Sequence, residues 1–402
     1  MDVISSSDQF YRYLKQTNTK LLANIIFAGS PGHQIAELDY FLRKYRCGDV
    51  PREGRYLWIQ GTGHIASTLA EVYGEHFRQF GVGMLAHDHY FAMASEIHRM
   101  VPDFGIDVGL SHLKNAVHSH ANTFVSKLGD RLYYYVTNDA VAQATLDYHR
   151  TRSLTEDFFP WNGACPRIEG PLADLLGGRV DRVAVIHFRT RPGNAGITIP
   201  AENLSLSFEY LRDNGFTLVK VGTEPYPEEF SRYGVINYSE SGLWSFKNDL
   251  ALLGNAKLNI INASGLEHIA DVMGGPIVSY GRWHLTLAPY SSKMVVVPAL
   301  LFDPGRQRFL TFGEQMLFFK TRHELWEGNA FGWHVPIDRF TPRVPQADEL
   351  CAAVQEALAL SHGDVPLTSE QKSFNQLDEN GLLSVGRSRI SQFFLERCRS
   401  HL

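Results

Sequence analysis

The chain has 402 residues and a mass of 45.3 kDa, and 44% of its residues are hydrophobic against 20% that are charged. A chain of this length favours two domains, each large enough to bury a core of its own. The net charge of −5 at pH 7 argues against a general nucleic-acid binder, which normally carries a basic excess.

Cysteine usage and hydropathy narrow the class of protein further. The four cysteines are widely scattered and form no C-x-x-C pair, a pattern typical of reduced thiols and not of a disulfide framework or a zinc site. The N-terminus has no basic region followed by an apolar core, and no apolar run approaches the roughly 18 residues of a membrane span. We therefore expect a soluble, cytoplasmic protein without a transmembrane segment; peripheral contact with a membrane stays open.

The N-terminal part of the chain is predicted to form a first Rossmann-like domain. A short amphipathic helix at residues 8–16 precedes the apolar run 21–27, which is typical of a buried strand. A Gly-rich turn at 28–34 then leads into a helix at 35–45, so that strand, turn and helix form an opening βα unit. The further elements expected here are a strand at 55–60, a helix at 65–80, a histidine-rich region at 87–120, a strand at 131–136 and a helix at 139–149.

A second alternation of strands and helices begins after residue 181. Short β-rich runs are separated by amphipathic helices, as a parallel, doubly wound sheet requires because each crossover covers a face of the sheet. Residues 303–343 are predicted to be irregular. The strands expected in this part are 183–186, 216–221, 235–238, 258–261, 276–280 and 294–301, and the helices are 202–213, 246–255, 266–273, 345–361 and 388–399.

The predicted fold class is α/β, with two Rossmann-like domains facing across a cleft. Residues 1–155 form the N-terminal Rossmann-like domain. Residues 156–180, rich in Pro, Gly and aromatic residues, form a linker. Residues 181–365 form the C-terminal Rossmann-like domain, and the helical tail at 366–402 is expected to cross back to the first domain.

Two loops of the C-terminal domain have the composition of a phosphate site. Arg189 and Arg191 follow a strand beside a Pro-Gly turn, and the planar fork of arginine suits phosphate oxygens. The loop at 262–265 opens a helix with small residues, so that a diphosphate or a ribose can approach the backbone closely. Ligands of doubly wound sheets bind at the carboxyl ends of the strands, where both loops lie. A nucleotide diphosphate would satisfy both loops, whereas surface charges and an ordinary helix cap explain them equally well.

Two segments of this domain resemble a known superfamily. His187-Phe188-Arg189 looks like the His-x-Arg motif that opens the donor domain of the fucosyltransferase superfamily. Residues 249–270 resemble the later donor-site motif of that superfamily, a helix, a strand and a small-residue loop. With two facing Rossmann-like domains, the chain resembles the GT-B glycosyltransferase architecture. In this resemblance the domain at 1–155 would bind the acceptor, and the domain at 181–365 would be the nucleotide-sugar donor domain.

A closer resemblance is to an uncharacterised family of glycosyltransferase-like proteins found in bacterial polysaccharide gene clusters. The likeness covers most of residues 32–280 and returns weakly at 390–395. It is carried, in chain order, by Gly32-His33, by the stretch 215–222 with Lys220 and Gly222, by Asp249 and by Ser264-Gly265. In the superfamily the loop after the motif arginine usually runs toward an acidic residue, whereas here it runs Thr190-Arg191-Pro192, so that neither a base nor a sugar is identified.

The resemblance implies a transferase that moves a sugar from a nucleotide-diphosphate sugar to a glycan, lipid-linked or small-molecule acceptor. The chain has no D-x-D motif, so we expect a metal-independent, inverting reaction with no cofactor apart from the nucleotide-sugar substrate. Charge on the leaving diphosphate would be met by Arg189, with Arg191 as a second candidate, and by the backbone N–H groups of residues 264–267.

The remaining donor-site candidates have ordinary structural alternatives. Asn262 and Ser264 would hold a ribose or phosphate oxygen, or only cap the following helix. Glu267 would bind ribose hydroxyls, although capping in the first helical turn is the simpler role. Lys220 would line a base pocket, against the more common role of a solvated loop residue, and Asp249 would contact the base or cap a turn. The donor-binding candidates are His187, Arg189, Arg191, Lys220, Gly222, Asp249, Asn262, Ser264, Gly265 and Glu267.

A base for the acceptor hydroxyl is expected at the turn after the first strand. His33 is the best candidate because it would point into the cleft and titrates near neutrality. Glu37, four residues on, would orient His33 or serve in its place. A purely structural role at the start of a helix explains both residues equally well. His64, after the second strand, is a parallel candidate.

For the remaining aromatic and histidine residues, a functional and a structural role are each open. Trp283 and His284 follow the strand at 276–280 and would contact the sugar, or pack in the core. The pair His118 and His120 has metal-like spacing, but no carboxylate or cysteine cluster accompanies it, so we predict no metal site.

Two other functions use the same two-domain shape. A nucleotide-sugar epimerase or hydrolase would need carboxylates from both domains in a closed site. A non-catalytic, two-lobed sugar- or nucleotide-binding protein would bind tightly without turnover.

Overall fold

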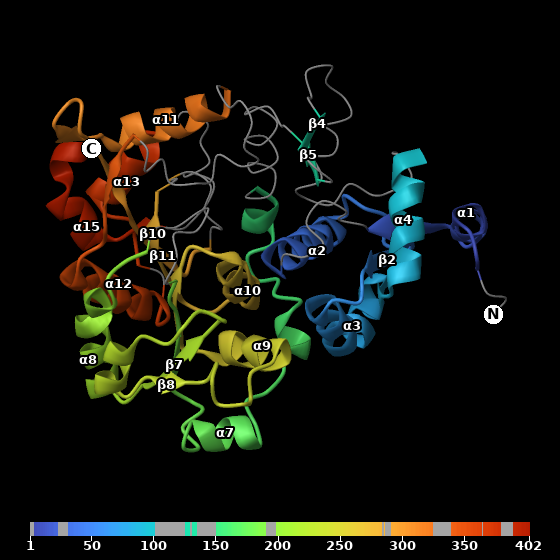
Figure 1. The fold of residues 1–402 in the computed structure, drawn as a ribbon, viewed down its shortest axis with the longest axis horizontal. Coiled ribbons are helices and arrows are strands. Elements are labelled where there is room, and N and C mark those ends of the chain that lie inside the picture. Colours follow the sequence, from blue (N-terminus) through green and yellow to red (C-terminus); the bar gives the residue numbers. More distant parts are fainter. Residues whose placement is uncertain are drawn as a thin grey trace.

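The computed structural model describes residues 4–22, 31–100, 125–128, 131–134, 150–189, 198–283, 285, 291–324, 339–363, 365–378 and 389–402. Within these ranges the protein is a mixed α/β structure built on two parallel sheets (Figure 1). None of the helices in these ranges combines the length and apolar character that crossing a membrane needs.

The first sheet, called the N-terminal sheet below, has three parallel strands in the order β1-β2-β3. Helix α2 connects β1 to β2, and α3 with η1 connects β2 to β3. Helices α1 and α4 pack together and share a small core with β1 and β2, and β4 and β5 form an antiparallel hairpin. The elements are α1 (Ser7–Gln16), β1 (Thr19–Leu22), α2 (Pro31–Cys47), β2 (Arg55–Gln60), α3 (His64–Phe77), η1 (Arg78–Phe80), β3 (Val82–Ala86), α4 (Asp88–Met100), β4 (Val125–Leu128) and β5 (Arg131–Tyr134).

The second sheet, the C-terminal sheet, has seven parallel strands in the order β15-β11-β10-β9-β6-β7-β8. The chain runs outward from β6 to β7 and β8, then returns to place β9 on the other side of β6. Strand order therefore reverses between β6 and β9, and such a switch point is where doubly wound sheets bind ligands. The strands are β6 (Val183–His187), β7 (Thr217–Val221), β8 (Ile236–Asn237), β9 (Leu258–Asn262), β10 (Ile277–Arg282), β11 (Met294–Pro298) and β15 (Arg389–Ile390).

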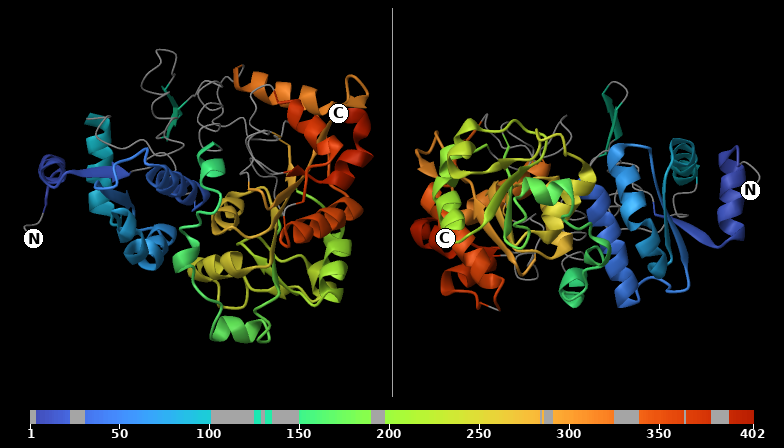
Figure 2. Two further views of the ribbon diagram at one scale, coloured as in Figure 1. Left: turned by 180° about the vertical axis from the view of Figure 1, so that it is seen from behind. Right: turned by 90° about the horizontal axis from the view of Figure 1, so that it is seen from below.

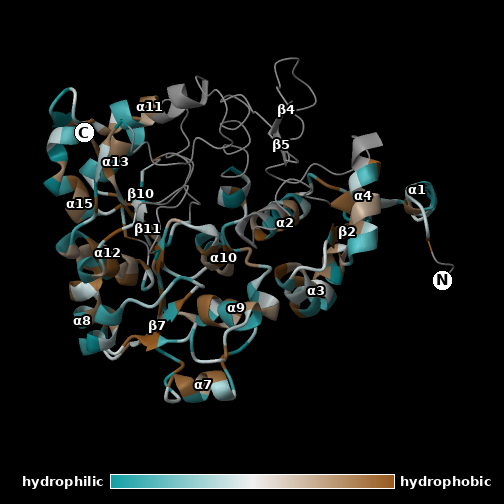
Figure 3. Ribbon diagram, viewed as in Figure 1, coloured by the Kyte–Doolittle hydropathy of each residue, from teal (hydrophilic) through white to brown (hydrophobic). Residues whose placement is uncertain are grey.

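Helices and a small antiparallel sheet, ordered β13-β12-β14, accompany the C-terminal sheet. Several helices, α9 and α12 among them, carry hydrophobic and hydrophilic residues side by side, as expected for helices with one face on a core (Figure 3). These elements are η4 (Asn162–Ala164), α7 (Pro171–Leu175), η5 (Ala201–Leu204), α8 (Ser205–Asp213), η6 (Glu228–Tyr233), α9 (Phe246–Asn255), α10 (Gly265–Met273), β12 (Leu300–Asp303), β13 (Arg308–Phe309), α11 (Phe312–Glu324), β14 (Thr341–Arg343), α12 (Ala347–Leu360), α13 (Ser369–Gln376), α15 (Gln392–Arg397) and η7 (Arg399–His401).

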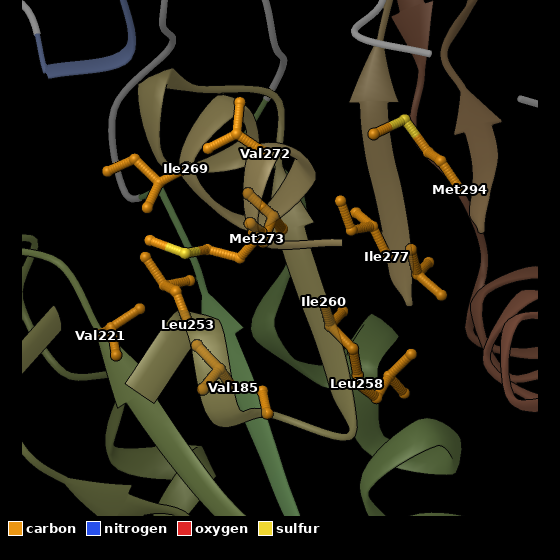
Figure 4. Close-up of a cluster of buried hydrophobic side chains, with 14 of the residues drawn as sticks. Val185, Val221, Leu253, Leu258, Ile260, Ile269, Val272, Met273, Ile277 and Met294 are labelled. Atoms are coloured by element: carbon orange, nitrogen blue, oxygen red, sulfur yellow. The ribbon is translucent and has the colours of Figure 1, made fainter. Parts of the chain in front are cut away.

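The core of this part lies between the C-terminal sheet and its helices. Every residue of β6, β9, β10 and β11 is buried, which is typical of parallel strands covered on both faces. Val185 and Ile260 from the sheet gather with Leu253 of α9 and Met273 of α10 (Figure 4). The sheet's position, and with it the position of its carboxyl edge, is set by this packing.

Local signals define the helices next to that edge. The side chain of Ser245 accepts a hydrogen bond from the Asn248 N–H at 3.1 Å and so caps α9. Helix α10 ends at Gly274, whose φ of 78° suits only a residue without a side chain. A Cβ on Gly274 would also lie 2.6 Å from the ring of Phe159.

Helices α2 and α10 join the two parts of the molecule (Figure 2). Their first turns approach so closely that a Cβ on Gly32 would lie 2.6 Å from the Gly265 Cα atom. Behind this contact lie two buried ion pairs: Arg43 donates to Asp39 at 2.7 Å within α2, and Arg152 binds Asp271 of α10.

Several elements differ from the sequence predictions. Strand β3 and helix α4 are not predicted, although Tyr90, Met93, Ala94 and Ile97 recur at helical spacing and form the buried face of α4. Residues 303–343, predicted as irregular, contain β13, β14 and α11, where Phe312 and Met316 are buried but mixed with charged residues. The predicted helix at 139–149 lies outside the described residues.

The C-terminal tail also takes another course than predicted. Its described residues add β15 to the edge of the C-terminal sheet, and α13 and α15 pack with each other, with α15 also against α12. Arg397 binds Asp348 at 2.5 Å, which ties the tail to α12. Figure 1 shows the two termini at opposite ends of the molecule, so the described part of the tail stays with the C-terminal sheet instead of crossing back.

Candidate functional site

The candidate site lies at the switch point of the C-terminal sheet, where β6 ends at His187 and β9 ends at Asn262. The imidazole Nδ1 atom of His187 lies 3.3 Å from the Asn262 carbonyl oxygen and 3.2 Å from the Ser264 hydroxyl oxygen. Tyr280, from β10, donates its hydroxyl to the His187 carbonyl at 2.9 Å. All the strands around the switch point therefore hold His187, which is buried.

The other imidazole nitrogen of His187 faces a carboxylate. Its Nε2 atom lies 3.4 Å from Oε2 of Glu224, in the loop after β7. Burial alone would raise the pKa of Glu224, but the hydrogen bond from His187 and the charges of His187 and Arg189 outweigh it and lower that pKa to about 2. Glu224 is therefore ionised at neutral pH.

Gly222 makes room for this pair. Its φ of +85° is a left-handed conformation, and a Cβ there would lie 2.9 Å from both the His187 ring and the Glu224 carboxylate. Gly222, which the sequence analysis predicts as a donor-site residue, therefore allows the side chains of His187 and Glu224 to approach each other.

Arg189 lies between the two loops of the switch point. Its Nη1 atom donates to the Ala263 carbonyl at 3.4 Å, directly before the Ser264 cap of α10. Ser264 accepts from the Leu266 N–H at 3.3 Å, so its side chain caps the helix as one of its two predicted roles required. A guanidinium and the positive end of a helix dipole are thereby brought together.

Glu267 has a different environment from the one expected for a ribose ligand. It is fully buried in the first turn of α10 and forms an ion pair with Arg282 of β10. Burial raises the pKa of Glu267, against the charge of Arg282. The pair fixes α10 to the sheet, and Gly265 lies against α2 on the other side.

A pocket of about 350 Å³ lies beside the switch point, between the loops that follow β7 and β8. Its volume is in the range of small-molecule sites. Two carboxylates face it, together with one aromatic ring. Its walls are Thr223, Glu224, Pro225, Ser239, Glu240 and Trp244.

Lys220 lies beneath the loops that follow β7 and β8, and its side chain is buried. It is buried in β7, and its Nζ atom donates to the Gly222 carbonyl at 3.1 Å, to the Ser239 hydroxyl at 3.0 Å and to the Glu224 carbonyl. Burial lowers the pKa of Lys220, while the nearby carboxylates act in the opposite direction. The more common role weighed from the sequence, a solvated loop residue, is therefore wrong for Lys220.

Asp249 lies behind the aromatic wall of the pocket. It is buried in the first turn of α9, and the side chain of Trp244 lies within hydrogen-bonding reach of its carboxylate. Burial raises the pKa of Asp249 to about 7, although the Trp244 hydrogen bond and the charge of Lys220 both lower it. Among the described residues its Oδ1 atom has no hydrogen-bond partner.

Among the described residues, helix α3 next to the N-terminal sheet brings side chains to this region. The ring of His64, at the start of α3, lies 6.0 Å from the Trp244 ring, centroid to centroid. Lys247 of α9 and Glu71 of α3 form an ion pair at 3.1 Å close by. His64 is thus a base candidate whose side chain lies near this pocket.

The structure leaves several predicted residues outside the described site. His33 and Glu37 lie in α2, but their side chains are outside the described residues. Trp283 is buried in a cluster with Leu301, Phe340 and neighbours, so core packing is its role here. Arg191, His284, His118 and His120 lie outside the described residues.

Trp244 and Glu240 are absent from the sequence predictions. Both lie in the loop between β8 and α9, which has no motif. The sequence signal that could have identified Trp244 was an aromatic residue directly before the Ser245 cap, in the loop after the predicted strand at 235–238.

No protein-family model and no curated protein sequence matches the chain. Three solved structures with a similar fold illustrate what it is similar to. A family 9 glycosyl transferase from Veillonella parvula is 13% identical with a TM-score of 0.42, over 85% of this chain and 96% of that one. The iron-containing dodecameric glycosyltransferase TibC from enterotoxigenic E. coli is 12% identical with a TM-score of 0.37, over 67% of this chain and 58% of that one. The E. coli heptosyltransferase WaaC, solved with ADP, is 14% identical with a TM-score of 0.35, over 76% of this chain and 97% of that one.

All three of these proteins are glycosyltransferases. With identities of 14% or less and TM-scores of 0.42 or less, the likeness by itself assigns no activity to this chain. The resemblance to the fucosyltransferase superfamily stays a prediction.

Proposed function

We propose that this protein is a GT-B-like glycosyltransferase that takes its sugar from a nucleotide diphosphate bound at the switch point of the C-terminal sheet. The observation that carries the proposal is the position of Arg189. It contacts the loop that opens α10 through Ala263, and its charge acts on Glu224, which lines the pocket. The Arg189 guanidinium therefore lies near both the N-terminus of α10 and the pocket, whose volume suits a nucleoside.

The two ends of this site differ in charge, as the two ends of a nucleotide do. At the α10 end, Arg189 and the helix dipole favour an anion. At the pocket end, Glu224 and Glu240 disfavour phosphate and accept hydrogen bonds from neutral donors. A nucleotide would place its diphosphate at the first end and its base and ribose at the second.

This arrangement suits departure of a diphosphate. In the proposed reaction an acceptor hydroxyl oxygen bonds to the anomeric carbon of the donor sugar, and the bond from that carbon to the diphosphate oxygen breaks. Negative charge then grows on the diphosphate, where Arg189 and the backbone N–H groups of the first turn of α10 stabilise it without a metal. The outcome is inversion if a single displacement occurs.

A base must take the proton of the acceptor hydroxyl. We propose His33 for this role, with Glu37 as its partner and His64 as a second candidate. The support is the backbone: Gly32, directly before His33, lies against Gly265 in the first turn of α10. The acceptor is a glycan, a lipid-linked sugar or a small molecule.

The experiment is a thermal-shift panel of ADP, GDP, UDP, CDP and dTDP and their sugars, each with and without Mg²⁺. Ligand at about 100 times its Kd adds roughly 2.7 kcal/mol of stability, which is readily measured. We expect one diphosphate to stabilise the protein independently of Mg²⁺, and Arg189→Ala to lose the shift. Arg212→Ala, at an exposed arginine paired with Asp213, is the matched control and should keep it.

The outcomes separate the competing functions. Binding followed by release of free sugar without an acceptor would indicate a hydrolase, and a changed donor sugar would indicate an epimerase. Tight binding without turnover would indicate a binding protein. No shift with any nucleotide would contradict the proposal.

A further inference from the structure

We propose that Trp244 is the face on which the base of the nucleotide stacks, and that Asp249 is the positioning residue that holds its indole ring in place. This inference rests on the proposed function, because it concerns the nucleoside end of the same site. It concerns how the base is held and leaves open which base it is.

The first observation is the exposure of Trp244. Its side chain is 38% exposed and forms a wall of the pocket, whereas Trp161 and Trp283 are completely buried. Pro225 supplies a second apolar surface in the same pocket. A flat, neutral group between them would cover apolar area that is otherwise in water.

The second observation is the charge around the ring. The carboxylates of Glu224 and Glu240 line the pocket, and none of the described residues that form its walls is cationic. A phosphate or a carboxylate would be repelled there, so the phosphate end of the ligand belongs with Arg189. The base is the part of a nucleotide that is flat, neutral and able to donate hydrogen bonds to carboxylates.

The third observation is that the indole is held from behind. The Trp244 side chain lies within hydrogen-bonding reach of the carboxylate of Asp249, which is 4% exposed. A buried carboxylate is costly unless it is paired, and the Oδ1 atom of Asp249 has no hydrogen-bond partner among the described residues. The protein therefore bears the free-energy cost of a buried carboxylate at the position where Asp249 contacts Trp244.

The backbone on both sides of Trp244 is held as well. Asn248 donates to the Leu243 carbonyl at 2.8 Å, and the Ser245 N–H donates to the Tyr238 hydroxyl oxygen at 3.0 Å. The hydroxyl of Tyr238 in turn donates to the Ser245 carbonyl at 3.1 Å. A ring that is already ordered loses little conformational entropy when a base stacks on it.

The experiment measures the Kd of the five nucleoside diphosphates and of inorganic pyrophosphate for a set of variants. Removing the ring in Trp244→Ala should weaken binding of the preferred nucleotide roughly 10- to 100-fold, the range found for base stacking on aromatic residues. Trp244→Phe should keep most of the affinity. Pyrophosphate, which has no base, should bind Trp244→Ala and the wild type equally, and Leu206→Ala, at an exposed residue of α8, is the control.

Asp249 is tested through its effect on Trp244. Asp249→Ala should weaken nucleotide binding roughly 2- to 10-fold through loss of ring order, and Asp249→Asn should restore it because the amide oxygen still accepts the indole N–H. In a Trp244→Ala background, Asp249→Ala should have no further effect. A merely structural role would not give this pattern of rescue and non-additivity.

Unchanged nucleotide affinity in folded Trp244→Ala overturns the stacking role, and an equal loss of pyrophosphate affinity overturns it as well. An undiminished effect of Asp249→Ala in the Trp244→Ala background overturns the positioning role. Both results leave the proposed function standing if the wild type binds a nucleotide. If the wild type binds none, the proposed function fails, and this inference fails with it.

Discussion

The carboxyl edges of the two sheets hold their polar side chains in opposite ways. At the C-terminal sheet, His187 and Lys220 are buried and each contacts several partners. At the N-terminal sheet, Thr62 and Asp88 meet on the surface, where the Thr62 N–H donates to the carboxylate at 2.8 Å, and His64 is exposed. One edge is thus preorganised by burial, and the other is open to solvent.

The largest effect is expected at Asp249. Its pKa is raised by burial from 3.8 to about 7, so the folded protein binds this proton more tightly than the unfolded chain. The resulting stability is complete below about pH 3.8 and is lost as the pH rises through 7. Asp249→Asn should therefore be more stable than the wild type at pH 8.5 by up to about 4 kcal/mol, and the difference should vanish toward pH 4.

Urea unfolding at pH 5 and pH 8.5 measures this difference. Asp213→Asn, at an exposed carboxylate of α8, is the control and should follow the wild type at both pH values. Parallel pH profiles for Asp249→Asn and the wild type would contradict the burial of an ionisable carboxylate behind Trp244.

A second large effect is expected where the two parts of the molecule meet. Gly32→Ala places a methyl group 2.6 Å from the Gly265 Cα atom, so α2 and α10 must separate, at a cost of about 3 kcal/mol. Gly74→Ala is the matched control, because its methyl group would meet nothing closer than 3.9 Å. In the middle of α3 it should stabilise the protein by about 0.5–1 kcal/mol. Opposite signs in denaturant unfolding are the expected result, and equal stabilities would show that the helices do not touch at Gly32.

A smaller effect is expected at Glu224, whose side chain is 25% exposed. Its pKa is lowered from 4.5 to about 2, so its contribution to stability is present above pH 4.5 and is lost as the pH falls through 2. Glu224→Gln should lose about 2 kcal/mol at pH 7, a value already reduced for its partial exposure. The difference from the wild type should narrow between pH 4.5 and pH 3, and a constant difference would mean that the charge of Glu224 is not responsible.

The smallest effect is expected at Asp88, the corresponding carboxylate of the open edge. Hydrogen bonds from Thr62 lower its pKa, so its contribution also lies above the unfolded pKa and is lost in acid. Because Asp88 is exposed, solvent screens the interaction. The melting temperature of Asp88→Asn at pH 7 should fall by less than that of Glu224→Gln, and an equal fall would remove the distinction between the two edges.

Much of the C-terminal sheet is predictable from the sequence. The helix at 246–255 agrees with α9, and the strand at 258–261 agrees with β9 to within one residue. Their signals are local: a Ser cap, a regular apolar period and a compact β-branched run. The loops at Arg189 and Ser264 are found for the same reason, because they follow such strands directly.

The candidate site is predictable only in part. Lys220 is expected in a solvated loop, but it is buried because the carbonyl oxygens of Gly222 and Glu224 turn back over it. Glu267 is expected to bind ribose hydroxyls or, more simply, to cap its helix, but Arg282, fifteen residues later in the chain, forms an ion pair with it in the fold. No local pattern records which charge a side chain will meet after strands from different segments have paired.

The sequence by itself determined the alternation of strands and helices and the ends of β6 and β9, because these depend on residues within one or two turns of each other. Only the tertiary structure decided the strand order that makes β6 and β9 neighbours, the contact of Gly32 with Gly265, and the burial of Asp249 behind Trp244. These features depend on parallel pairing and packing between segments far apart in the chain. The free energy of these contacts is gained only after the whole sheet has formed.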